Sequence, residues 1–85
     1  MNYIITFYTH FGATFLKAKC DLAGFENELS PTPRALSASC GVCLRLSASD
    51  YEPLAEFVSA LSVDADIDAL FIQDSEGYQQ LLHFE

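Results

Sequence analysis

Residues 3–9, with the sequence YIITFYT, are all β-branched or aromatic. Such residues favour β-strands, and a run of them without polar alternation is typical of a strand that is buried on both faces. We therefore expect this segment to lie in the centre of a sheet. A chain of 85 residues has room for one core, because so short a domain buries only about 60–65% of the surface of its unfolded chain. The sequence predicts a single domain, residues 1–85, built around this strand.

A helix is predicted directly after this strand. Thr9 can accept a hydrogen bond from the first turn, and Gly24 suits the left-handed backbone that often ends a helix. Between them, apolar residues recur at three- and four-residue spacings, which is typical of a helix with one apolar face. We expect the core-facing residues to be Phe11, Phe15, Ala18 and Leu22, with Leu16, Cys20 and Ala23 alongside.

Two further strands follow this helix. Residues 25–34 alternate over a short stretch that ends at Pro31 and Pro33, and because proline lacks the N–H that a sheet interior needs, this strand fits a sheet edge. Residues 42–47 alternate more regularly, which predicts a strand with one apolar face. The residues of its apolar face are Val42, Leu44 and Leu46. The residues of its other face are Cys43, Arg45 and Ser47.

The second half of the chain predicts one helix and one or two strands. Ser49 and Glu52 have the spacing of a capping box, so a helix should begin there. Residues 68–73 read as the next strand, and the DSEG that follows has the composition of a turn. Residues 78–84 fit a hairpin strand better than a short helix. An acidic stretch contains Asp64, Asp66 and Asp68. Because it lacks the glycine and the distal glutamate of a calcium-binding loop, we interpret it as a solvated linker.

The predicted order of elements is βαββαβ, with an additional C-terminal strand. This order is that of the α+β class and the ferredoxin-like split βαβ sandwich, in which two helices cover one face of an antiparallel sheet. The other face stays open. Because neighbouring residues of a strand point to opposite faces, Cys43 and Arg45 should emerge together on the uncovered face.

Composition and charge exclude several classes of function. The net charge of −8 disfavours nucleic-acid binding, because Lys and Arg supply most of the affinity for phosphates. The chain has no apolar run near the roughly 18–20 residues of a membrane span and no signal-peptide pattern, so we expect a cytoplasmic protein. Three cysteines are too few, and odd in number, for a disulfide-built domain, so free thiols are expected.

Cys40 and Cys43 form a Cys-x-x-Cys pair that allows several interpretations. Thioredoxin-like pairs sit at a helix N-terminus, whereas a strand follows this one. A zinc ribbon needs a second pair, and His10 and His83 are single and far apart, so we predict no metal and no cofactor. Packing as two small apolar residues remains as plausible from the pattern as a functional site.

Reactivity at this pair would depend on nearby cations. The thiolate is the reactive form, and a positive charge lowers the thiol pKa from about 8.5. Arg45 lies two positions from Cys43 along the same strand, and Arg34 lies in the loop that leads to Cys40. If both arginines reach the sulfurs, the apparent thiol pKa should fall well below about 8, and Arg45→Ala should raise it. Gly41 suits a tight turn that would let the sulfurs meet.

The layout resembles the Se/S carrier-like protein family, of the DUF3343 type. The segments that carry the resemblance are YIITFYTHFGA, then PTPRALSASCG, then an arginine two residues beyond the second cysteine. It runs from about Tyr3 into the strand at residues 69–73, whereas the tail from Asp74 onward exceeds the pattern. The resemblance implies a cysteine that holds sulfur or selenium and passes it to a protein partner.

The resemblance also assigns roles to individual residues. Cys40 matches the family's central cysteine and becomes the carrier, and Arg34 and Ser39 are neighbours that could bind the anion. Cys43 either resolves a persulfide on Cys40 or is only a strand residue. The candidate site therefore consists of two thiols and four supporting residues: Cys40 and Cys43, with Arg34, Ser39, Gly41 and Arg45.

Two functions from different classes follow from these observations. The first is a non-enzymatic sulfur or selenium carrier that delivers an adduct on Cys40 to a partner enzyme. The alternative is a protein-interaction or small-ligand-binding module that uses the open sheet face, where a second copy of the chain could also bind. A thiol oxidoreductase ranks below both.

Overall fold

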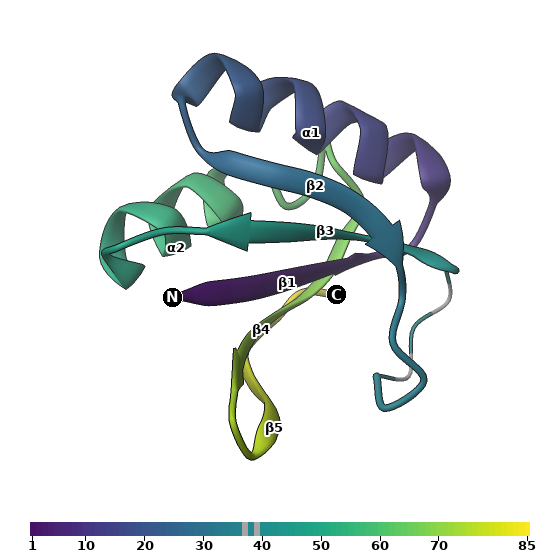
Figure 1. Ribbon diagram of the computed structural model, residues 1–85. Coiled ribbons are helices and arrows are strands. Elements are labelled where there is room, and N and C mark those ends of the chain that lie inside the picture. The colour runs from purple at the N-terminus through teal and green to yellow at the C-terminus, as the bar shows by residue number, and fades with distance from the viewer. Residues whose placement is uncertain (37, 39) are drawn as a thin grey trace.

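The computed structural model describes residues 1–36, 38 and 40–85. Strands and helices follow one another in the predicted order, and the final segment is a strand (Figure 1). Each expected element is present, with ends within a few residues of the prediction. The elements are β1 (Asn2–Phe7), α1 (His10–Ala23), β2 (Glu26–Pro31), β3 (Val42–Ser47), α2 (Tyr51–Ala60), β4 (Ile67–Asp74) and β5 (Gly77–His83).

The five strands form one antiparallel sheet in the order β2-β3-β1-β4-β5. β1 pairs with β3 on one side and with β4 on the other, so it lies in the middle of the sheet as its composition predicted. α1 links β1 to β2 across β3, and α2 links β3 to β4 across β1. This arrangement confirms the ferredoxin-like split βαβ fold, with β5 added beyond β4.

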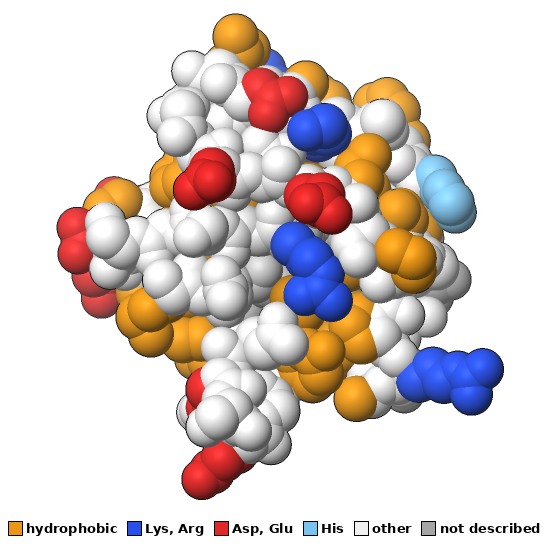
Figure 2. Space-filling view, in the orientation of Figure 1, with side chains coloured by type: hydrophobic (Ala, Val, Ile, Leu, Met, Phe, Trp, Pro, Cys, Tyr) orange, Lys and Arg blue, Asp and Glu red, His pale blue; other side chains and the backbone are white. Residues whose placement is uncertain are grey.

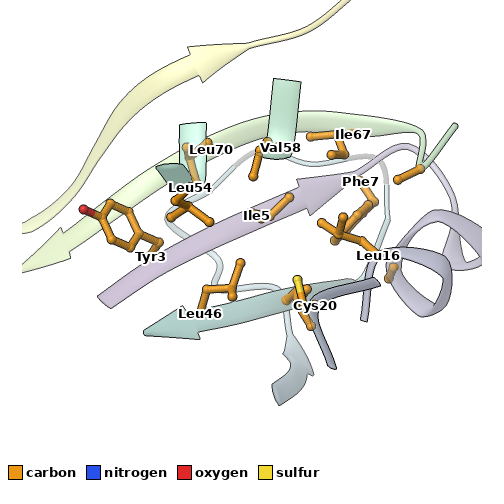
Figure 3. Packing of buried hydrophobic residues seen from close by; sticks show 13 residues of the cluster. Tyr3, Ile5, Phe7, Leu16, Cys20, Leu46, Leu54, Val58, Ile67 and Leu70 are labelled. Atoms are coloured by element: carbon orange, nitrogen blue, oxygen red, sulfur yellow. The ribbon is translucent and has the colours of Figure 1, made fainter. Parts of the chain in front are cut away.

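Both helices cover the same face of the sheet. Alternate residues of β1 point toward them and pack with residues of α1 and α2 into one hydrophobic cluster (Figure 3). Figure 3 labels side chains from β1, α1, β3, α2 and β4 in this cluster, which is the main core. Its labelled members are Tyr3, Ile5, Phe7, Leu16, Cys20, Leu46, Leu54, Val58, Ile67 and Leu70.

The ends of α1 are as predicted. The Thr9 side chain accepts a hydrogen bond from the Gly12 N–H at 3.1 Å, and Gly24 adopts the left-handed conformation with φ of 85°. Both signals are local: a residue with a side-chain oxygen precedes the helix, and a residue without a Cβ follows it. Local chemistry of this kind can be read from sequence.

The core-facing side of α1 differs from the prediction. Phe11 and Leu22 were expected in the core, but they are 65% and 85% exposed. The buried residues of α1 are Gly12, Ala13, Leu16 and Cys20. The physical reason is the approach of the turn before β4: a Cβ added at Gly12 would lie 1.9 Å from the carbonyl oxygen of Ala65. Only a helix face that carries glycine can come so close, so Phe11 turns outward.

The face opposite the helices is not open in its centre, which corrects a second expectation. Ile4, Leu36 and Cys43 form a buried cluster there, and Phe71 and Tyr78 pack against it. Leu36 comes from the segment between β2 and β3, which projects on the side of the sheet away from α1 in Figure 1. Apolar groups therefore cover both faces of β1.

The start of α2 also differs from the prediction. The helix begins at Tyr51, and its N-cap residue is Asp50, whose side chain makes no capping hydrogen bond. Ser49 thus lies one position before the N-cap, where it cannot form the predicted capping box with Glu52. The spacing of the two residues was correct for a capping box, but their register relative to the helix was not.

The acidic stretch before β4 is structured, so its interpretation as a solvated linker was wrong. Asp66 has φ of 48°, and its carboxylate accepts a hydrogen bond from the Thr9 hydroxyl at 2.8 Å. Asp68 belongs to β4, where it accepts from the Thr6 hydroxyl at 3.2 Å and pairs with Nε2 of His83 at 3.3 Å. These contacts join the start of α1 and the end of β5 to the same turn.

Neither helix in the described part of the chain is long and apolar enough to cross a membrane.

The contact between Gly12 and Ala65 predicts a large effect of a small substitution. Gly12→Ala would place a methyl group against a backbone oxygen, and backbone cannot move aside cheaply. We expect the free energy of unfolding to fall by about 3 kcal/mol or more, measured by urea denaturation.

Gly41→Ala is the matched control, because a Cβ at Gly41 meets nothing within 4 Å. It should change the free energy of unfolding by less than about 1 kcal/mol. Equal effects of the two substitutions would contradict the close approach of α1 to the turn.

Candidate functional site

The segment that carries Cys40 is closed at its base by two hydrogen bonds. It leaves the sheet after Pro31 and returns at Val42, which are paired across β2 and β3. The Thr32 N–H donates to the Gly41 carbonyl oxygen at 2.9 Å, and the Thr32 hydroxyl donates to the Cys40 carbonyl oxygen at 3.1 Å. Cys40 is therefore held at the point where the segment rejoins the sheet.

Cys43 lies on the sheet face away from the helices, as the alternation of β3 predicted, but it is not exposed. Its exposed fraction is 0%, and it is packed with Ile4 and Leu36. The thiol lies 3.7 Å from the Pro31 carbonyl oxygen, to which it donates a weak hydrogen bond. The expectation that Cys43 would emerge from this face is wrong because Leu36 covers it.

Burial raises the pKa of the Cys43 thiol. The positive charge of Arg45 and the Thr32 hydroxyl act in the opposite direction, and the Cys40 thiolate adds to the increase. Burial prevails because an anion loses more by leaving water than a partly screened cation restores. For Cys43, the expected low pKa is therefore wrong, although the predicted influence of Arg45 has the correct sign.

Cys40 is also buried, with an exposed fraction of 5%. It lies near enough to Cys43 for its charge to act on the pKa of the Cys43 thiol. Cys40 is the less deeply covered of the two. The described structure has all three cysteines as free thiols.

Arg45 occupies the same sheet face as Cys43 and is held in place by two neutral acceptors. Its Nε donates to the Ser30 hydroxyl on β2 at 3.2 Å, and its Nη1 donates to Oε1 of Gln73 on β4 at 3.2 Å. The side chain thus lies across the sheet from β2 toward β4. Arg45 therefore lies on the same sheet face as Cys43, and two hydrogen bonds hold its guanidinium group in place.

The other predicted site residues are Arg34, Gly41 and Ser39. Arg34 is exposed in a turn, and among the described residues it takes part in no ion pair. Gly41 does not use a positive φ, so its backbone there is open to any residue. Ser39 lies outside the described residues.

A family model described as Putative Se/S carrier protein-like matches residues 2–66. The chain belongs to this family. The match contains Cys40, Cys43 and both arginines of the site, and it ends before β4. No curated protein and no solved structure matches the chain.

β4 and β5 of this Se/S carrier-like protein therefore lie beyond the matched residues. Backbone pairing with β4 and the contact of His83 with Asp68 hold β5 in the sheet. Tyr8 reaches the same end of the sheet, where its hydroxyl donates to the Phe84 carbonyl oxygen. Tyr78 of β5 packs against the buried cluster that contains Cys43. The tail thus contributes to the cover of the thiol.

Cys20 belongs to the core and not to the site. It lies in the cluster under the helices, and its exposed fraction is 0%. Burial, with a contribution from Asp21, raises the pKa of Cys20 to about 12, against a smaller lowering by Lys17. The prediction that Cys20 serves packing is confirmed.

Sequence reasoning missed Thr32 and Leu36. The segment 32–41 consists of small, polar or proline residues except for Leu36 and Arg34. A single large aliphatic residue in such a loop is a signal that the loop packs onto the domain. Within the described residues, His, Cys, Asp and Glu side chains do not gather in groups of three or more that could hold a metal ion.

The cover over Cys43 predicts an effect on thiol labelling. Alkylation of Cys43 should be slow at neutral pH and should accelerate as pH rises, because its raised pKa keeps it protonated. Leu36→Ala removes the covering side chain and should increase the labelling rate of Cys43 by at least about tenfold, measured by mass spectrometry of alkylated peptides.

Leu22→Ala provides the matched control, since Leu22 is 85% exposed on α1. In this variant, Cys43 should be alkylated at the same rate as in the unmodified protein. Fast alkylation of Cys43 at neutral pH without any substitution would contradict the enclosed position of this thiol.

Proposed function

We propose that this protein is a non-enzymatic carrier that holds sulfur or selenium on Cys40 for delivery to a partner enzyme. Membership of the Se/S carrier-like family supports this function in outline. The observation that supports Cys40 as the carrier is its exposure: Cys40 is 5% exposed, whereas Cys43 in the buried cluster is 0% exposed. The less covered thiol is the one that a partner can reach first.

Partial burial suits a carrier of a persulfide. The terminal sulfur of a persulfide can pass to any thiolate that reaches it, so an exposed adduct would be lost to small thiols. A covered adduct is protected until a partner displaces the segment 32–41. Such a partner would have to break the two hydrogen bonds that Thr32 makes to the end of this segment. It would also have to disturb the apolar contacts of Leu36.

Loading is a transfer of one sulfur atom between thiols. The Cys40 thiolate attacks the terminal sulfur of a donor persulfide, a bond forms between the two sulfurs, and the donor leaves as a thiolate. The product is a Cys40 persulfide. Delivery repeats the same step with a thiolate of the acceptor as the attacking group. Selenium would follow the same course with a perselenide-type adduct.

Cys43 supplies a second route for release. Its thiolate would attack the Cys40 sulfur of the persulfide, form a Cys40–Cys43 disulfide, and release hydrosulfide; an external thiol would then reduce the disulfide. Because burial raises the pKa of Cys43, this thiolate is scarce at neutral pH. The raised pKa therefore limits premature discharge of the adduct. The reducing cytoplasm is the compartment that would keep both thiols free.

The function is tested by loading the protein with a cysteine desulfurase and cysteine. Mass spectrometry should find one added sulfur atom on Cys40, and Cys40→Ser should abolish the addition. Cys43→Ser should retain it and should slow the release of sulfide above neutral pH, since the attacking thiolate is missing. Cys20→Ala, which removes a thiol from the helix side of the sheet, should load as the unmodified chain does.

Cysteines that carry no added sulfur atom after this incubation would contradict the carrier function. If sulfur is added to Cys43 alone, and the Cys40→Ser variant still accepts sulfur normally, the assignment of Cys40 as the carrier residue is wrong. Folding of each variant is checked by urea denaturation, so that a lost addition is not confused with an unfolded chain.

A further inference from the structure

The sheet face that carries Cys43 also contains an open hollow toward the other end of β3. The hollow has a volume of about 330 Å³, within the range of small-molecule sites. The molecular surface in Figure 2 has acidic and basic side chains close together near the middle of the view. The polar residues that line the hollow include Asn2, Glu26, Asn27, Glu28, Arg45, Ser47 and Gln73.

The orientation of Arg45 is unusual for its position in the sheet. Glu28 lies directly opposite Arg45 in the register of β2 and β3, and opposite charges in such positions normally attract. Yet the ion pairs of the described residues do not include Arg45 with Glu28 or with Glu26. The guanidinium instead bonds the neutral Ser30 and Gln73. Two carboxylates and a cation thus line one hollow without a direct ion pair between them.

Arg45 retains capacity to bind a ligand. A guanidinium has five N–H donors, and the contacts with Ser30 and Gln73 use one on Nε and one on Nη1. Its position is fixed from both ends, so little side-chain entropy remains to be lost when a ligand binds. A carboxylate is the group that a guanidinium binds with the best geometry.

The charges of the hollow select the kind of ligand. A simple anion attracted by Arg45 would be repelled by Glu26 and Glu28, and a simple cation attracted by these carboxylates would be repelled by Arg45. A molecule that carries both charges a few bonds apart satisfies both sides. The neutral amide and hydroxyl groups of Asn2, Ser47 and Gln73 suit a small polar remainder.

We propose that this hollow binds a free α-amino acid as its zwitterion, with a small polar side chain. Its carboxylate binds Arg45, and its ammonium group binds Glu28 and Glu26. The site is distinct from the thiols, and the inference stands on the hollow and its charges, whether or not Cys40 carries sulfur. No covalent step is involved.

The test is a titration with L-serine followed by two-dimensional NMR of the ¹⁵N-labelled protein at neutral pH. We expect saturable shifts of backbone amides near residues 26–28, 45–47 and 73. Arg45→Gln and Glu28→Gln should each weaken binding by at least about tenfold, because each removes a charge-assisted contact. Glu52→Gln, which makes the same charge change at an exposed position on α2, should leave the affinity unchanged.

Two fragments of the ligand test the need for both charges. Acetate offers only the carboxylate, and ethanolamine offers only the ammonium group with a hydroxyl. Neither should produce the shifts that L-serine produces at the same concentration. Equal shifts with acetate, equal shifts with ethanolamine, or the absence of saturable shifts with L-serine would each overturn the proposal. Glu28 is exposed, so its variant tests the site even if Arg45→Gln fails to fold.

Discussion

The burial of β1 on both faces is the constraint on which the rest of the structure depends. Tyr3, Ile5 and Phe7 pack under the helices, while Ile4 lies fully buried on the opposite face. The two helices of a split βαβ fold can cover only one face, so the second face needs another cover. Leu36 and the aromatic residues of the β4–β5 hairpin provide it. The segment between β2 and β3 therefore packs onto the sheet.

This cover decides the chemistry of the Cys43 thiol. Cys43 shares its face with Ile4, so whatever covers Ile4 also removes Cys43 from water. The pKa of Cys43 is raised in spite of Arg45, because the cost of burying the anion exceeds the attraction of a cation that neutral groups already hold. On the proposed function, this cover would protect a sulfur adduct until a partner displaces it.

The sequence predicted most of the fold because the relevant signals are local. Strand composition, the Thr9 cap and Gly24 each depend on neighbours along the chain, and each was predicted correctly. The outward position of Phe11 could not be predicted, because it depends on the approach of Gly12 to the distant Ala65. The composition of residues 3–9 implied two buried faces, whereas the fold class implied one open face. The expectation of an open face prevailed in the sequence analysis, and only the structure shows that Leu36 covers Cys43 on that face.

β3 carries one residue of each proposed site: Cys43 of the thiol pair and Arg45 of the hollow. Cys43 and Arg45 lie two residues apart on it, about 7 Å along the strand, with the thiols to one side and the hollow to the other. Arg45 opposes the rise in the pKa of Cys43, whereas Glu26 and Glu28 are not among the causes of this shift. A ligand whose carboxylate binds Arg45 and whose ammonium group binds these glutamates would therefore raise the pKa of Cys43 further. By linkage, ionisation of Cys43 would weaken that ligand by the same factor. An occupied hollow would therefore keep Cys43 protonated and an adduct on Cys40 intact.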